Sequence, residues 1–238
     1  GTACVGSVSG TTITFGTPTV IQSANLLAFG ATFDSNNNKV VVVYTNQSSS
    51  EISQASVGTV DPSDNSISFG TAATYDSSSG TSNNAAAFDT SNNKVAILYR
   101  DLYSGGGHGK SRVGTVSGTD ITFGTEVTFE SADSQFIESV FDTSNNKVVV
   151  VYKDDGNSGY GTAIVGTISG TDISFGTAAV FESANVSDIS IAFDSSNNKV
   201  IIAYRDIGNS GHGTAIVGTV SGTSISLAAI QWLYIFRI

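Results

Sequence analysis

Three segments of the chain place a basic residue beside an acidic one, and each ends with a glycine that follows a histidine or a tyrosine. They read YRDLYSGGGHG at 99–109, YKDDGNSGYG at 152–161 and YRDIGNSGHG at 204–213. Carboxylates, hydroxyls and a ring that can stack on a pyranose are the groups that a sugar site needs. The candidate ligand-binding residues are therefore Arg100, Asp101, Tyr103, His108, Lys153, Asp154, Tyr160, Arg205, Asp206 and His212. A purely structural explanation stays open, in which the Asp caps the loop and glycine permits a tight turn.

The same loops offer hard oxygen atoms that could bind calcium. They lack the alternating acids and the terminal Glu of an EF-hand loop, so the sequence predicts no cofactor and leaves calcium as an alternative. The residues in question are Asp154, Asp155, Asn157, Asp206 and Asn209.

Several catalytic chemistries find little support. Two carboxylates across a pocket could cleave a glycoside, but near-identical copies do not single out an acid and a base. His108 and His212 occupy equivalent positions, so they suggest no Ser-His-Asp arrangement, and no Gly-rich phosphate loop opens a helix. The sequence predicts a protein that is not an enzyme, with glycoside hydrolase as an alternative.

The candidate residues recur because the whole chain is a tandem repeat. The segment Val-Gly-[Ser/Thr]-[Val/Ile] starts at positions 5, 57, 113, 165 and 217, so its spacings are 52, 56, 52 and 52 residues. A second marker, Phe-Asp followed by Asn-Asn-Lys-Val, starts at 33, 88, 141 and 193. We assign repeats to 1–25, 26–79, 80–134, 135–186 and 187–226, with a divergent tail at 227–238, all in one domain.

Each repeat contains four segments with strand-like patterns. Strand a ends in Phe-Asp, as in 189–194; strand b is the Val-rich run at 199–204; strand c covers 214–220; strand d is typified by 172–176 and its continuation to 181. Ser-Asn-Asn-Lys and Ser-Gly-Thr turns join a to b and c to d, because Asn and Gly tolerate left-handed backbone angles. Strand b should be buried on both faces. No segment shows a capped helical period.

Four strands in about 50 residues are typical of one blade of a β-propeller. A β-solenoid and a sandwich of hairpins are the rival all-β folds. The chain has five c–d hairpins but four a–b hairpins, so we expect five blades, with both termini in the closing blade and the tail at 230–236 as inner strands. Four blades, or a segment of a longer array, remain alternatives, and the tail could instead dock onto virion or filament subunits.

Composition limits the possible partners and location. The net charge is −10 and no basic run occurs, so nucleic acid and anionic membranes should be repelled. The sequence contains no run of 18 apolar residues, so it predicts no membrane span. Because Cys4 is the single cysteine, an internal disulfide is excluded. The missing initiator Met suggests processing or a fragment of a longer reading frame. The acidic surface, rich in Ser, Thr and Asn, suits an extracellular or virion location.

The units ISIAFDSSNNKVIIAY and YRDIGNSGHGTAIVGTVSGT resemble repeats of marine phage and environmental surface proteins of propeller type. The resemblance covers nearly the whole chain except its last dozen residues, and it implies a virion or cell-surface appendage used in host attachment. It brings no assigned site residue. We expect a non-enzymatic, lectin-like module that binds carbohydrate through its b–c and d–a loops, with avidity from several equivalent sites. The alternatives are a purely architectural virion or filament component and a glycoside hydrolase.

Overall fold

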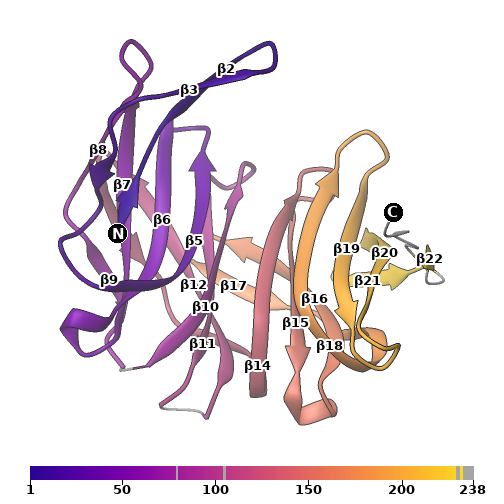
Figure 1. The fold of residues 1–238 in the computed structure, drawn as a ribbon. Coiled ribbons are helices and arrows are strands. Elements are labelled where there is room, and N and C mark those ends of the chain that lie inside the picture. The colour runs from indigo at the N-terminus through magenta and orange to yellow at the C-terminus, as the bar shows by residue number, and fades with distance from the viewer. Residues whose placement is uncertain (79, 104–105, 229–230, 233–238) are drawn as a thin grey trace.

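The computed structural model describes residues 1–78, 80–103, 106–228 and 231–232, and the fold is all-β (Figure 1). Four antiparallel four-stranded units follow one another along the chain, as the repeat predicts. Two short 3-10 turns, η1 (Gln47–Ser49) and η2 (Asp155–Asn157), are the only helical segments of the described residues. In that same part of the chain, no helix is long and apolar enough to cross a membrane.

Each unit runs from an inner strand a through strands b and c to an outer strand d. Unit 1 comprises β5 (Leu26–Asp34), β6 (Lys39–Asn46), β7 (Ile52–Asp61), β8 (Ser66–Phe69) and β9 (Ala73–Asp76). Strand d consists of two successive segments that both pair with strand c, such as β8 and β9 in unit 1. Unit 2 comprises β10 (Thr81–Asp89), β11 (Lys94–Asp101), β12 (His108–Ser117), β13 (Asp120–Phe123) and the start of β14 (Val127–Asp142). Unit 3 comprises the rest of β14, β15 (Lys147–Asp154), β16 (Tyr160–Ser169), β17 (Asp172–Phe175) and the start of β18 (Ala179–Asp194). Unit 4 comprises the rest of β18, β19 (Lys199–Asp206), β20 (His212–Ser221), β21 (Ser224–Leu227) and β22 (Gln231–Trp232).

The N-terminal residues form only the outer half of such a unit. This half-unit comprises β1 (Thr2–Ala3), β2 (Gly6–Ser9), β3 (Thr12–Phe15) and β4 (Thr19–Val20). Strands β1 and β2 correspond to strand c, and they pair with β4 and β3, which correspond to strand d. Figure 1 shows β2 and β3 at the upper left, beside unit 1, while unit 4 lies at the right.

The predicted d–a loops are wrong in the second half of the chain. Strands β14 and β18 each run for 16 residues without a loop. The first part of β14 pairs with β12 as an outer strand, and from Ser134 onward it pairs with β15 as the inner strand of the next unit. The strand therefore changes sheets through bulges while its backbone groups stay paired, which removes the need for a connecting loop.

The a–b turns follow the chemistry that their sequence predicts. In the second unit, Asp89 Oδ1 accepts hydrogen bonds from the backbone nitrogens of Ser91 (2.8 Å) and Asn92 (3.0 Å). Asn93 then takes a left-handed φ of 54°. Asp34, Asp142 and Asp194 close the other three turns in the same way. Each inner hairpin therefore contains the groups that define its own turn.

The core lies between units. The forward face of unit 1 carries Val41, Val43 and Val57, and it packs against Phe88 and Ile121 of unit 2. Equivalent clusters join unit 2 to unit 3 and unit 3 to unit 4. Every side chain of the Val run in β15 is at most 1% exposed, so the prediction that strand b is buried on both faces is confirmed for unit 3. In unit 4, Ala203 of strand b is exposed, so burial there is incomplete.

The units stand side by side through their inner strands, in the order β5, β10, β14, β18. Within the described residues no sheet closes on itself, and β5 and β18 do not come together as the successive strands do. The tail does not supply inner strands where it is described, because Gln231 and Trp232 pair with β20 as the outer strand of unit 4. That part of the prediction is wrong; the rest of the predicted tail strand lies outside the described residues.

Candidate functional site

The repeat is interrupted most strongly where unit 1 meets unit 2. Three charged residues of unit 2, Lys110, Arg112 and Glu126, replace uncharged residues at the equivalent positions of units 1, 3 and 4. For Lys110 these are Gln54, Thr162 and Thr214; for Arg112 they are Ser56, Ile164 and Ile216; for Glu126 they are Ala72 and Ala178 in units 1 and 3. A catalytic site needs groups with different roles, so a junction that departs from the repeat is the place to look for one.

A tyrosine of strand b marks the same junction. In units 3 and 4 its hydroxyl donates to a glutamate of the preceding unit's outer strand: Tyr152 to Glu130 (3.1 Å) and Tyr204 to Glu182 (3.0 Å). At the junction the equivalent acid is the shorter Asp76. The Tyr99 hydroxyl donates instead to Glu126 Oε2, at 2.6 Å. Two carboxylates therefore occupy a place where the other junctions have one.

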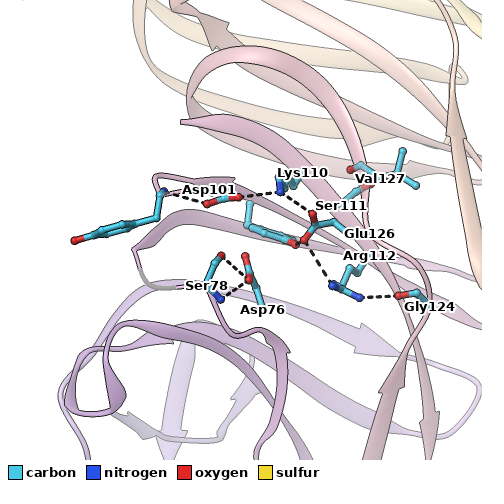
Figure 2. Close-up of polar contacts among 11 residues, drawn as sticks. Asp76, Ser78, Asp101, Lys110, Ser111, Arg112, Gly124, Glu126 and Val127 are labelled. Carbon is cyan, nitrogen blue, oxygen red and sulfur yellow. Dashed lines mark hydrogen bonds and ion pairs between the residues drawn. The ribbon is translucent and has the colours of Figure 1, made fainter. Parts of the chain in front are cut away.

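Glu126 is held in its ionised form by a ring of donors (Figure 2). Lys110 Nζ lies 2.6 Å from Glu126 Oε1, and an Arg112 guanidinium nitrogen lies 3.6 Å from Oε2. Partial burial acts to raise the pKa of Glu126. The hydrogen bonds from Lys110 and Tyr99 and the two positive charges outweigh it and hold that pKa below its ordinary value.

Lys110 connects Glu126 to a second carboxylate. Its Nζ lies 2.9 Å from Asp101 Oδ2, and the Asp101 side chain is fully buried. Burial acts to lower the pKa of Lys110, but the hydrogen bonds and charges of Glu126 and Asp101 raise it overall. The lysine is therefore a permanent cation between two acids, and it neutralises charge that would otherwise be costly to bury.

Asp76 has the opposite character. Its side chain is in a residue only 7% exposed, and Oδ1 accepts from the Ser78 backbone nitrogen (2.8 Å) and hydroxyl (2.6 Å). Its other oxygen, Oδ2, is buried and has no hydrogen-bond partner among the described residues. Burial, followed by the charges of Asp101 and Glu126, raises the pKa of Asp76 against the lowering effect of the Ser78 bonds. Asp76 therefore keeps its proton to higher pH than an ordinary aspartate does, which is a property that a proton donor needs.

An open cavity lies beside these groups. It measures about 360 Å³ and is lined by Thr74, Tyr75, Asp76, Ser77, Arg112 and Phe123. It therefore combines Asp76 with a cation and with the partly exposed ring of Phe123, against which the buried Tyr75 ring packs. A ring such as that of Phe123 can cover the apolar face of a sugar.

Replacing Asp76 by Asn is expected to stabilise the fold at neutral pH. A folded-state pKa above the unfolded value gives stability that is present at low pH and lost as pH rises through the folded pKa. Asparagine can still accept the Ser78 hydrogen bonds and carries no charge. We expect a gain on the order of 1 kcal/mol near pH 7 and none in acid. Urea unfolding at both pH values measures it; equal effects at the two pH values would contradict the assignment.

The predicted basic residues make ion pairs close to their own loops. Arg100 Nε lies 2.6 Å from Asp133 Oδ1, and a second guanidinium nitrogen lies 2.8 Å from Oδ2. Lys153 Nζ lies 2.9 Å from Asp155 Oδ1. Arg205 is the exposed equivalent in unit 4. The three predicted sets thus lie at the same position of three successive units, and their role in ligand binding stays a prediction.

The predicted acids mostly serve their own turns. Asp154 Oδ1 accepts from the Asn157 backbone nitrogen at 3.1 Å, and Asp206 Oδ1 accepts from that of Asn209 at 3.0 Å. Asp101 Oδ1 accepts from the backbone nitrogen of Tyr103, at 3.1 Å. These contacts match the capping explanation that the sequence left open.

The predicted rings begin strands. His108, Tyr160 and His212 are the first residues of β12, β16 and β20. The His212 ring hydrogen-bonds the Asn209 carbonyl. The fourth predicted ring, Tyr103, lies on a loop and is 70% exposed. Over the described parts of the chain, no three His, Cys, Asp or Glu side chains gather as metal ligands. Calcium binding by Asp154, Asp155, Asn157, Asp206 and Asn209 stays a prediction.

Sequence reasoning missed the residues of the unit 1–unit 2 junction. Asp76 ends β9, Lys110 and Arg112 lie within β12, and Glu126 directly precedes β14. The predicted site lies on the variable b–c loops, whereas these residues lie on strands or next to them. Comparing each strand position between repeats would have found them, because only unit 2 has a charged residue at each of these three positions.

No family model matches the chain, and no curated protein matches it. A solved structure is similar: the exo-β-1,3-galactanase from Phanerochaete chrysosporium with β-1,3-galactotriose. The TM-score is 0.57 at 11% identity, over 89% of this chain and 50% of that one. This chain therefore spans half the length of that protein, and the likeness is one of fold. The expectation of a non-enzymatic, lectin-like module is contradicted, since the structure that the fold resembles is that of an enzyme, an exo-β-1,3-galactanase.

Proposed function

We propose that the chain is the β-propeller scaffold of a glycoside hydrolase, with units 1 to 4 as blades. Two observations support the architecture. The four-stranded units stand side by side through their inner strands, and the similar solved structure is that of a galactanase. The expectation of five blades belongs to this proposal, as does a glycan as the ligand.

The observation that carries the proposal is the pair of carboxyls whose pKa values are pushed apart. The pKa of Asp76 is raised above its ordinary value and that of Glu126 is lowered below its own. Glycoside hydrolysis uses one carboxyl group that keeps its proton to higher pH and one that is ionised. The difference arises from the surroundings: Asp76 is buried beside negative charge, whereas Glu126 is surrounded by Lys110, Arg112 and the Tyr99 hydroxyl.

In the proposed reaction Asp76 donates its proton to the glycosidic oxygen while the bond from that oxygen to the anomeric carbon breaks. Glu126 stabilises the positive charge that develops at the sugar ring. A water molecule then supplies the oxygen that the anomeric carbon gains, and its proton returns to the carboxylate pair. Lys110 and Arg112 act on Glu126, which they keep ionised, and the partly exposed Phe123 offers a ring for the sugar to stack on.

The test is hydrolysis of defined glycans. The chain is incubated with β-1,3-galactan, the linkage that the similar protein's structure contains, and with other neutral β-linked polysaccharides, at several pH values. Release of reducing sugar, identified by chromatography, is the expected result, and it should disappear in Glu126→Gln. No release from any substrate, or release that Glu126→Gln leaves unchanged, would overturn the proposal.

The location of the protein is a separate matter. An extracellular or virion-surface location, and membership of a phage-like repeat family, stay predictions from the sequence. A secreted or particle-borne enzyme that acts on polysaccharide is compatible with the acidic surface that the net charge of −10 describes.

A further inference from the structure

The two ends of the row of units are exposed versions of surfaces that are buried everywhere else. On the forward face, Val57, Val113 and Val165 of units 1 to 3 are 0% exposed, whereas Val217 of unit 4 is 39% exposed. The neighbouring Ala203 is exposed too, although its equivalents Val43, Leu98 and Val151 are fully buried. In each earlier unit, the next unit covers these residues.

The opposite end shows the same contrast. Phe33 on the back face of unit 1 is 51% exposed, whereas Phe88 and Phe141 are 6% and 8% exposed. Those two phenylalanines pack on strand b of the unit before them. The half-unit that precedes unit 1 has strands c and d only, so it has no strand b to offer Phe33.

The half-unit itself has an open edge and an open face. In units 1 to 4 strand c pairs with strand b on one side and strand d on the other, but the described β1 and β2 pair only with d. Val8 and Ile13 are 71% and 54% exposed. Their equivalents Val220 and Ile225 in unit 4 are buried against the forward face of unit 3.

We propose that the space between unit 4 and the half-unit is a docking site for one β-hairpin with the sequence pattern of the chain's own a–b hairpins. One such hairpin would pair with the free edge of β1 and β2. Its two faces would cover Phe33 on one side and the forward face of unit 4 on the other. Both faces continue an interface that the chain already forms three times, which identifies the occupant.

A second copy of the chain does not fit these surfaces equally well. Each of its four a–b hairpins is already paired with a strand c and is packed within its own unit. A copy docking through its end faces would bury apolar surface but would leave the β1–β2 edge without a strand to pair with. Because exposed strand edges attract additional strands, a free hairpin satisfies more of the site.

The test uses the chain of residues 1–238 and a labelled synthetic hairpin of residues 186–206, VSDISIAFDSSNNKVIIAYRD. Fluorescence anisotropy should show saturable binding of one hairpin per chain. Val217→Asp and Ile13→Asp, on the two sides of the site, should each weaken binding about tenfold or more, since an apolar contact is replaced by a charge. Val180→Asp is the matched control, because Val180 is 44% exposed but lies on the outer strand of unit 3, and it should change binding less than about twofold.

The single thiol gives an independent readout. Cys4 is exposed, whereas its equivalents Ile164 and Ile216 are only 4% and 3% exposed. Docking should therefore slow the reaction of Cys4 with a thiol reagent. Because a free hairpin can self-associate, the same sequence appended after Ile238 through a flexible linker should protect Cys4 in the same way.

Three results would overturn the proposal. One is the absence of saturable binding together with unchanged Cys4 reactivity in the linked form. Another is binding that Val217→Asp and Ile13→Asp weaken no more than Val180→Asp does. The third is a stable dimer in sedimentation that protects Cys4 without any hairpin, which would assign the two faces to a second copy. None of these readouts depends on glycan hydrolysis, so they are independent of the proposed activity.

Discussion

Asp76→Asn is expected to lower kcat on a natural β-glycan about 10³-fold, the usual contribution of a general acid. The alkaline limb of the pH–rate profile should also disappear, because Asp76, with its raised pKa, is the group that must remain protonated. The substitution leaves the Ser78 hydrogen bonds possible and changes little in size. Steady-state rates across pH on the best polysaccharide from the substrate series measure both effects.

Two comparisons separate a lost proton donor from general damage. Glu182→Gln alters the acid at the equivalent position of unit 3, which is buried and accepts from Tyr204, and it should leave the rate nearly unchanged. An aryl glycoside with an acidic phenol needs little protonation of its leaving oxygen, so Asp76→Asn should lose much less activity on it. Equal losses on both substrates, or an equal loss in Glu182→Gln, would refute the assignment of Asp76.

Lys110→Met is expected to lower the free energy of unfolding by about 3 kcal/mol near pH 7, because it removes the cation beside a fully buried carboxylate. The same change removes the donor that lies 2.6 Å from Glu126 Oε1, so the pKa of Glu126 should rise. Urea unfolding measures the first effect. The acid limb of the pH–rate profile should move to higher pH and report the second.

The matched control is Lys199→Met, because Lys199 also lies on a strand but donates to the Thr219 hydroxyl, at 2.8 Å. Its loss should cost less than about 1 kcal/mol. The double variant Lys110→Met with Asp101→Asn should recover much of the lost stability, since it removes the buried charge together with its partner. If the double variant is no more stable than Lys110→Met, the lysine acts through packing rather than charge.

The strands and turns could be predicted from the sequence because their causes are local and occur several times. The Val-rich strand b, the Asp and Asn residues of the a–b turn and the Gly of the c–d turn each act within a few residues. Because each pattern recurs in four or five copies, differences confined to one copy do not obscure it. The continuous β14 and β18 could not be read this way, because a strand that changes partners halfway depends on both neighbouring sheets.

The candidate site could not be predicted from the loops because its contacts cross long stretches of sequence. Tyr99 and Glu126 are 27 residues apart, and Asp76 interacts with charges that belong to the following unit. A repeat is recognised from the residues that its copies share, so a residue that differs in one copy only, such as Lys110, does not stand out. The expectation of a non-enzymatic protein followed from the near-identity of three loops, whereas the asymmetry lies on strands of one unit.

The Asp residue that closes each a–b turn also has a consequence for how such a chain can change in length over evolution. Because the turn is defined by groups within its own hairpin, a duplicated stretch of about 52 residues contains all the residues that its a–b turn needs to form. A newly copied stretch needs only one surface to settle on, and it presents the same surface to whatever comes after. Recombination between repeats can therefore add or delete complete modules, while substitutions in a single copy are free to acquire new chemistry.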